Sequence, residues 1–229
     1  METVIATEGL CKNFGEGELQ IKALKDVDLS IVRGEFTAIV GPSGSGKTTL
    51  LNILCGLDVP SSGEIRVSGK PLSTLNGSEL ARFRRDHIGL VFQAYNLIPV
   101  LTVMENIEYV MLLQGISAKE RKNRVLEFLQ RIGLEGKEKR FPAELSGGQQ
   151  QRVAIARAMV SQPDLILADE PTANLDSETG IQLLEMMRNF NRDQQMTFIF
   201  STHDPMIMER ASRLITLTDG RIVKDEQRD

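Results

Sequence analysis

Residues 36–48 read Phe-Thr-Ala-Ile-Val-Gly-Pro-Ser-Gly-Ser-Gly-Lys-Thr, and this stretch decides the fold. Its first five residues form a short apolar run, which is typical of a strand buried on both faces. A helical pattern follows at about Thr49 to Leu57. The eight residues between strand and helix match the pattern G-x-x-x-x-G-K-[ST] of a phosphate-binding loop. They are Gly41, Pro42, Ser43, Gly44, Ser45, Gly46, Lys47 and Thr48.

This pattern has a direct chemical meaning. Glycines let backbone N–H groups converge on phosphate oxygens, and the helix that follows adds its partly positive amino end. Lys47 is expected to reach the β- and γ-phosphates, the Thr48 hydroxyl to ligate Mg²⁺, and Thr49 to belong to the same site. The alternative, a purely structural glycine-rich turn, is disfavoured because strand, loop and helix occur in the required order.

A second candidate segment, residues 165–170, reads Leu-Ile-Leu-Ala-Asp-Glu. Four apolar residues followed by two carboxylates predict a buried strand that delivers acids at its carboxyl end, where open α/β sheets bind ligands. Asp169 suits the Mg²⁺ sphere through water. Glu170 suits the orientation or deprotonation of an attacking water. Without the phosphate loop, such a pair would equally suit a helix cap.

The rest of the chain alternates between strand and helix patterns. Residues 4–32 alternate apolar and polar positions as half-exposed strands do, and shorter strand patterns occupy residues 63–69, 88–92 and 198–200. Residues 95–160 are helical in character, and a further helix pattern covers residues 178–190. This order predicts an α/β core that carries a helical insertion.

Composition excludes several classes of protein. The chain has 229 residues, which is about one domain or one core with an inserted subdomain. Its formal net charge of -4 and its pI of about 5.4 argue against a dedicated nucleic-acid binder. No apolar run approaches the roughly 18 residues that would span a bilayer, and the amino terminus lacks a signal-peptide pattern, so we expect a cytosolic chain whose membrane role comes through a partner.

Several isolated residues have structural interpretations. Cys11 and Cys55 fit no zinc spacing, and we expect Cys55 to be a buried, inert thiol. Met186, Met187, Met206 and Met208 occur at helical spacing and are expected in the core. His87 lies in no motif and is predicted to be a surface residue.

Residues 145–149, Leu-Ser-Gly-Gly-Gln, resemble the signature of ATP-binding cassette (ABC) ATPases. Ser146 and the amides of Gly147 and Gly148, with Gln149, begin a predicted helix that could hold an anion. By itself the pentapeptide would also suit a helix cap. In ABC proteins it faces the phosphate loop of another subunit, so the resemblance implies that ATP is enclosed between two copies of the chain.

Four further positions fall in the order found in that family. The resemblance implies that Gln93 contacts Mg²⁺ and hinges the helical insertion, and that His203 contacts the γ-phosphate. It places Asp176 in a loop that crosses between subunits, although Asp176 could equally be a helix cap. Phe14 takes the position that stacks on adenine, where the family usually has Tyr, and a core Phe remains the alternative.

The resemblance implies a fold and a division of the chain. The fold is a P-loop NTPase (RecA-like) core with an antiparallel β subdomain and an inserted α-helical subdomain. Residues 1–229 form a single ABC ATPase domain. Residues 1–92 hold the β subdomain and the phosphate-loop part of the core, residues 93–160 the helical subdomain with the signature, and residues 161–229 the rest of the core.

The implied activity is that of an ATPase motor that forms a homodimer around two ATP–Mg²⁺. Its closure would act on a separate integral membrane permease docked near Gln93 to Val103, with the chain peripheral at the cytoplasmic face of the inner membrane. The resemblance is closest to the branch that releases lipoproteins and exports macrolides. Two alternatives stay open: a cell-division ATPase that regulates a periplasmic hydrolase, and an amino-acid importer.

Three other classes fit less well. A phosphate-loop kinase or GTPase has no use for residues 145–149. A DNA-repair or chromosome-organising ABC ATPase would need a long heptad insertion. A translation-associated ABC protein usually carries two cassettes, and this sequence has one.

Overall fold

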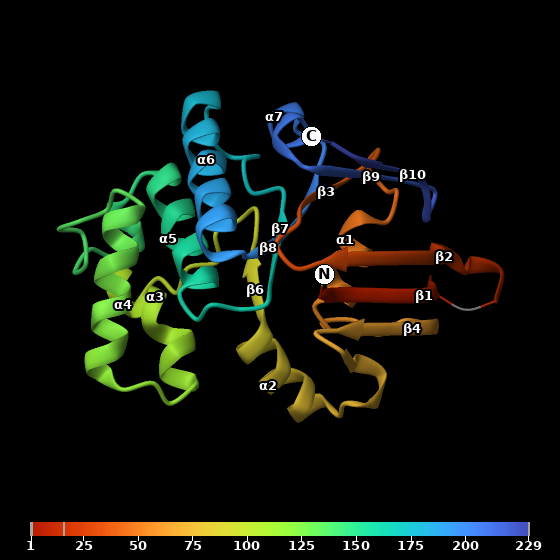
Figure 1. The fold of residues 1–229 in the computed structure, drawn as a ribbon, viewed down its shortest axis with the longest axis horizontal. Helices are drawn as coiled ribbons and strands as arrows, with labels where there is room; N and C mark the ends of the chain where they lie inside the picture. The colour runs from red at the N-terminus through yellow and green to blue at the C-terminus, as the bar shows by residue number, and fades with distance from the viewer. Residues whose placement is uncertain (1, 16, 229) are drawn as a thin grey trace.

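The computed structural model describes residues 2–15 and 17–228. It contains two β-sheets and a group of helices that extends from one side of the larger sheet (Figure 1). This arrangement confirms the predicted α/β architecture with an antiparallel β part and a helical part.

The smaller sheet is antiparallel and has the strand order β2-β1-β4-β5. Its strands are β1 (Thr3–Phe14), β2 (Ile21–Val32), β4 (Ser62–Val67) and β5 (Lys70–Pro71). Buried and exposed residues alternate along much of β1 and β2, as the sequence pattern predicted for half-exposed strands.

The larger sheet has the order β10-β9-β3-β8-β7-β6. Its strands are β3 (Phe36–Val40), β6 (Ile88–Val91), β7 (Leu165–Asp169), β8 (Thr197–Thr202), β9 (Arg213–Thr218) and β10 (Arg221–Gln227). All neighbouring pairs are parallel except β9 and β10. The parallel strands β3, β7 and β8 therefore end at one edge of the sheet, where the phosphate loop, Asp169 and His203 follow them.

Seven α-helices complete the fold: α1 (Lys47–Leu54), α2 (Gly77–His87), α3 (Val103–Leu113), α4 (Ala118–Arg131), α5 (Gly147–Met159), α6 (Ser177–Gln194) and α7 (Pro205–Arg210) among the described residues. Three short 3-10 turns are η1 (Gly17–Leu19), η2 (Leu72–Thr74) and η3 (Pro142–Glu144). Helices α3, α4 and α5 lie between β6 and β7 in the chain, so the helical part is inserted as predicted; its boundaries at residues 93 and 160 stay a prediction.

Helix α2 was not predicted. Asn76 and Glu79 close a capping box at its start, but Phe83 is its one buried residue. A helix that buries a single side chain leaves almost no apolar periodicity in the sequence. In addition, α1 begins two residues before the predicted start, and α6 extends beyond the predicted helix at both ends.

Two hydrophobic clusters cover the two faces of the larger sheet. Phe36, Ala38 and Val40 of β3 belong to the cluster that includes the inserted helices. Ile39 lies on the other face of β3 and belongs to the cluster shared with β1, β2 and α1. Because every residue of β3 is buried, the expectation of a strand covered on both faces is confirmed.

The structural predictions for isolated residues were mostly correct. The four methionines pack in or against the core, and Cys55 is buried, which raises the pKa of its thiol to about 11. The prediction for His87 was wrong. Its ring stacks on Phe83, and its Nδ1 lies 2.7 Å from Oδ2 of Asp164, so His87 is a half-buried structural residue. No helix of the described residues combines the length and apolar character needed to cross a bilayer.

Candidate active site

The phosphate loop is held by contacts that only glycine permits. A Cβ on Gly41 would lie 2.0 Å from the carbonyl oxygen of Leu217 in β9. Gly46 has a φ of 105° and precedes α1 without any side-chain cap, and a Cβ there would lie 2.6 Å from the Ala23 carbonyl oxygen. The loop is therefore pressed against β2 and β9, and the first amides of α1 are left for a ligand or water.

Lys47 folds back over this loop. Its Nζ donates to the carbonyl oxygens of Gly41 at 2.8 Å and Pro42 at 3.0 Å. Ser45 Oγ is buried with no hydrogen-bond partner among the described residues. The ammonium group thus already lies beside the cradle in which phosphate oxygens would be bound.

The carboxylates at the end of β7 face the same place. Thr48 Oγ1 donates to Asp169 Oδ2 at 3.3 Å. Across residues 2–15 and 17–228 no group of three His, Cys, Asp or Glu is arranged to hold a metal alone. A hydroxyl and one carboxylate instead fit Mg²⁺, which usually binds one or two carboxylates together with substrate phosphates and water.

Two residues that are adjacent in the chain, Thr202 and His203, hold the Glu170 carboxylate. Its Oε1 lies 2.6 Å from Nδ1 of His203, and Oε2 accepts a hydrogen bond from Thr202 Oγ1 at 3.2 Å. Its backbone has a φ of 46°, and its N–H donates to Ser201 O at 2.9 Å. The Glu170 side chain is 17% exposed, whereas that of His203 is 77% exposed, so the carboxylate is fixed and the imidazole faces open space.

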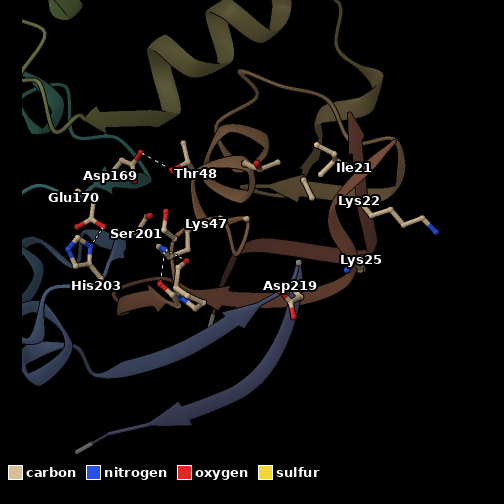
Figure 2. Close-up of a pocket in the computed structure, with 18 of the residues that line it drawn as sticks. Ile21, Lys22, Lys25, Lys47, Thr48, Asp169, Glu170, Ser201, His203 and Asp219 are labelled. Atoms are coloured by element: carbon tan, nitrogen blue, oxygen red, sulfur yellow. Dashed lines mark hydrogen bonds and ion pairs between the residues drawn. The ribbon is translucent and has the colours of Figure 1, made fainter. Parts of the chain in front are cut away.

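These groups meet in one cavity of about 820 Å³ (Figure 2). Most of the predicted site residues line it: Gly41, Pro42, Ser43, Gly44, Gly46, Lys47, Thr48, Thr49, Gln93, Asp169, Glu170 and His203. No sequence pattern indicated a second group of lining residues at the far end of the cavity, namely Ile21, Lys22, Lys25 and Asp219. These residues come from β2 and the β9–β10 turn and are brought there only by the tertiary fold.

Phe14 is not among the residues that line the cavity. It ends β1, is 45% exposed, and lies opposite Ile21 in the register of β1 and β2. Lys12 Nζ lies 4.9 Å from the centre of its ring. The exposure contradicts the alternative of a core phenylalanine, and its stacking on adenine stays a prediction.

The signature residues form a different surface. Ser146 caps α5 and closes a capping box with Gln149. These residues, together with Gly147 and Gly148, border a hollow of about 430 Å³ that has no lining residue in common with the first cavity. Asp176 borders the same hollow and caps α6. The hydrogen bond from the Thr179 N–H lowers the pKa of Asp176, so the capping interpretation is confirmed.

Two contacts that the sequence did not predict hold the segment around Gln93. Asn174 Nδ2 donates to the Gln93 carbonyl oxygen at 2.9 Å. Arg157 of α5 donates to the carbonyl oxygens of Tyr95 and Asn96, which have φ angles of 58° and 50°. Burial removes the Arg157 guanidinium from water, and this desolvation lowers its pKa.

Comparison with known proteins gives consistent matches. Residues 24–173 match the ABC transporter family. The chain is 47% identical over 222 residues to the macrolide export ATP-binding/permease protein MacB of Marinobacter nauticus, covering 97% of this chain and 34% of that protein. It is also 47% identical over 203 residues to the ABC transporter ATP-binding protein YtrE of Bacillus subtilis, covering 89% and 88%. The chain thus spans about a third of the length of the MacB relatives that it matches.

A solved structure agrees with these relatives. The ATP-binding cassette MJ0796, in a dimeric post-hydrolysis state bound to ADP and Pi, superposes with a TM-score of 0.89 at 43% identity. The match covers 97% of this chain and 98% of that one. With the phosphate loop, the carboxylate pair and the signature helix in place, the chain belongs to the ABC transporter family as one of its ATPase cassettes.

Proposed function

We propose that two copies of this cassette close around two ATP molecules and hydrolyse them to drive a transmembrane partner. One observation carries the proposal: the catalytic cavity and the signature hollow are separate surfaces of one chain. A signature helix start can therefore complete the cavity of a second copy. The dimeric state of MJ0796 with ADP and Pi supports this arrangement.

The site residues divide the chemistry of hydrolysis among them. Lys47 and the amides of α1 bind the β- and γ-phosphate oxygens and neutralise charge as the terminal P–O bond to ADP breaks. Glu170 orients the attacking water and accepts its proton, and His203 holds the carboxylate through Nδ1. The new bond joins the water oxygen to the γ-phosphorus, and ADP leaves.

Mg²⁺ would be held by Thr48, Gln93 and Asp169, where it supplies positive charge to the β- and γ-phosphates. The 3.3 Å contact between Thr48 and Asp169 supports this assignment, because the two oxygens already lie side by side. Phe14 would lie against the adenine ring beyond Ile21.

A transmembrane permease is proposed to dock near Gln93 to Val103, placing the cassette at the cytoplasmic face of the cell membrane. Val100 in this segment is 77% exposed, which suits a buried contact with a partner. The names of the MacB relatives combine an ATP-binding part with a permease and specify macrolide export, which supports export as the direction. Lipoprotein release stays a prediction.

The substitution Glu170→Gln tests the proposal. It removes the proton acceptor and keeps the shape of the side chain, so hydrolysis should fall by about 10²–10⁴-fold. ATP should remain bound, and dimer should accumulate in size-exclusion chromatography. Glu127→Gln, at an exposed position of α4, is the matched control and should behave as the parent chain. A wild-type rate for Glu170→Gln, or monomer alone in the presence of ATP, would contradict the proposal.

A further inference from the structure

Gln151 is a buried polar residue that the proposed chemistry does not use. It lies on α5, one turn after the start of the helix at Gly147, and it is 0% exposed. Its Nε2 donates to the carbonyl oxygen of Pro171 at 2.7 Å. Its Oε1 is buried with no hydrogen-bond partner among the described residues.

The carbonyl that Gln151 holds belongs to the residue directly after Glu170. Pro171 is buried, and Gln151 is the only donor to its oxygen in the part of the chain that the structure describes. The neighbouring backbone groups are satisfied locally: the Glu170 carbonyl accepts from the N–H of Ala173, and the Thr172 carbonyl from that of Leu175. The Pro171–Thr172 peptide is therefore fixed from α5, whereas the Glu170–Pro171 peptide before it is bound within the turn itself.

This contact matters because the turn is conformationally demanding. Glu170 has a φ of 46°, a region that few residues with side chains adopt. Such a backbone persists only where its surroundings fix it. The hydrogen bond from Gln151 is one of the contacts that fix this backbone. The Gln151 amide is oriented so that Nε2, which can donate, faces the Pro171 carbonyl, and Oε1 is left without a partner among the described residues. An apolar residue of the same size would fill the space and remove the unpaired Oε1, but it would leave the Pro171 carbonyl oxygen without its donor.

We infer that Gln151 is a positioning residue for hydrolysis: it sets the turn of Glu170 from the signature helix. On the proposed function, ATP held by the opposite copy binds at the start of α5. Because α5 is continuous from Gly147 to Met159, a displacement of its start is carried to the Pro171 carbonyl and hence to the backbone of Glu170. The carboxylate of one copy then responds to the nucleotide held by the other copy's phosphate loop.

The substitution Gln151→Met tests this role, because it keeps volume and removes the donor. We expect kcat for ATP to fall about tenfold with KM within about twofold, since the nucleotide cradle is untouched. Gln194→Met is the matched control: Gln194 also has a buried, unpaired Oε1, but it ends α6, away from the cavity. Its kcat should equal that of the parent chain. A parent-like kcat for a folded Gln151→Met, or a change in KM alone, would overturn the inference.

A second variant keeps the test decisive if Gln151→Met does not fold. In Gln151→Glu the carboxyl can donate to Pro171 O only when protonated, and burial favours that form. The ratio of its kcat to that of the parent chain should therefore fall by about tenfold from about pH 6 to about pH 9. A merely space-filling residue would give a constant ratio, and a constant ratio would overturn the inference.

Failure of this inference is distinguishable from failure of the proposed function. If the parent chain hydrolyses ATP and Glu170→Gln does not, while Gln151→Met retains the parent kcat, only the role of Gln151 is wrong. If Glu170→Gln hydrolyses at the parent rate, the proposed function is wrong, and the inference about Gln151 is wrong with it.

Discussion

The starts of α1 and α5 are both glycine-containing turns that lead into a helix, yet they are built differently. Gly46 precedes α1 without a side-chain cap, so the first amides of α1 need a partner from outside the helix. Ser146 precedes α5 and forms a closed capping box with Gln149. The first helix start therefore presents amides that can bind an anion, whereas the second is capped by its own side chains.

The residues around the two helix starts differ as well. The start of α1 faces a lysine, two carboxylates and a histidine, which are the groups to which the proposed function assigns hydrolysis. The hollow at α5 contains Arg152, Asp176 and Thr179 around the signature, and no pair corresponding to Glu170 and His203. This difference supports the proposal that each chain has one surface that binds and cleaves ATP and another that contacts a nucleotide bound to a second copy.

The largest effect on hydrolysis should come from a substitution at the start of α1. Lys47→Ala removes the one lysine of the phosphate loop, so hydrolysis should fall by at least about 10²–10³-fold and binding of labelled ATP to the single chain should weaken strongly. Fluorescence anisotropy and phosphate release measure the two effects. The control Lys122→Ala changes an exposed lysine of α4 and should alter neither. Parent-like ATP binding by Lys47→Ala would mean that α1 is not the primary binding site.

A substitution at the start of α5 should separate ATP binding from ATP-dependent dimerisation. Ser146→Ala removes the cap hydroxyl, so the single chain should bind labelled ATP normally, while ATP-dependent dimer and kcat should both fall by about tenfold. The loss of a cap also costs about 1 kcal/mol of stability. Ser117→Ala removes the corresponding cap of α4 and controls for that cost, because Ser117 accepts from Glu120 N–H in the same way. If both variants lost dimer equally, the effect would be one of stability and not of the signature surface.

The contrast between the two helix starts also explains what the sequence could predict. The phosphate loop and the Asp169–Glu170 pair are local patterns, because a strand, a turn and the residues at its end are consecutive in the chain. Their meeting in one cavity follows from the parallel order of β3, β7 and β8. The prediction that the signature lies on a separate surface came from the family resemblance and not from residue spacing.

Other features depend on contacts between distant segments, and no local pattern in the sequence indicates them. Lys22 and Lys25 reach the cavity because β2 lies against the phosphate loop, and Gln151 reaches Pro171 because α5 packs against β6, the strand next to β7. Helix α2 has too few buried residues to show a period. His87 was misassigned because its partner, Asp164, is 77 positions away in the chain.

The smallest expected effect on catalysis lies at the opposite end of the strand that delivers Asp169. Asp164 immediately precedes β7 and accepts hydrogen bonds from Arg33 at 3.0 Å and Ser68 at 2.9 Å, with His87 Nδ1 at 2.7 Å. Burial alone would raise the pKa of Asp164, but the hydrogen bonds from His87, Arg33 and Ser68 outweigh it and hold the pKa below its ordinary value. The residue before β7 is thus a structural carboxylate, and the last residue of β7 is the carboxylate proposed to hold Mg²⁺.

Asp164→Asn should therefore lower stability and leave hydrolysis unchanged. A carboxyl whose pKa is lowered on folding stabilises the folded chain above its unfolded pKa, and that contribution is lost as pH falls through the folded value. The variant should be less stable than the parent by about 1–3 kcal/mol near pH 7, and the gap should close below about pH 4, as urea unfolding at both pH values would show. A gap that stayed constant in acid would mean that packing, and not charge, explains it. A fall in kcat would mean that the two ends of β7 are coupled, and the active site could then no longer be assigned to the carboxyl edge of the sheet alone.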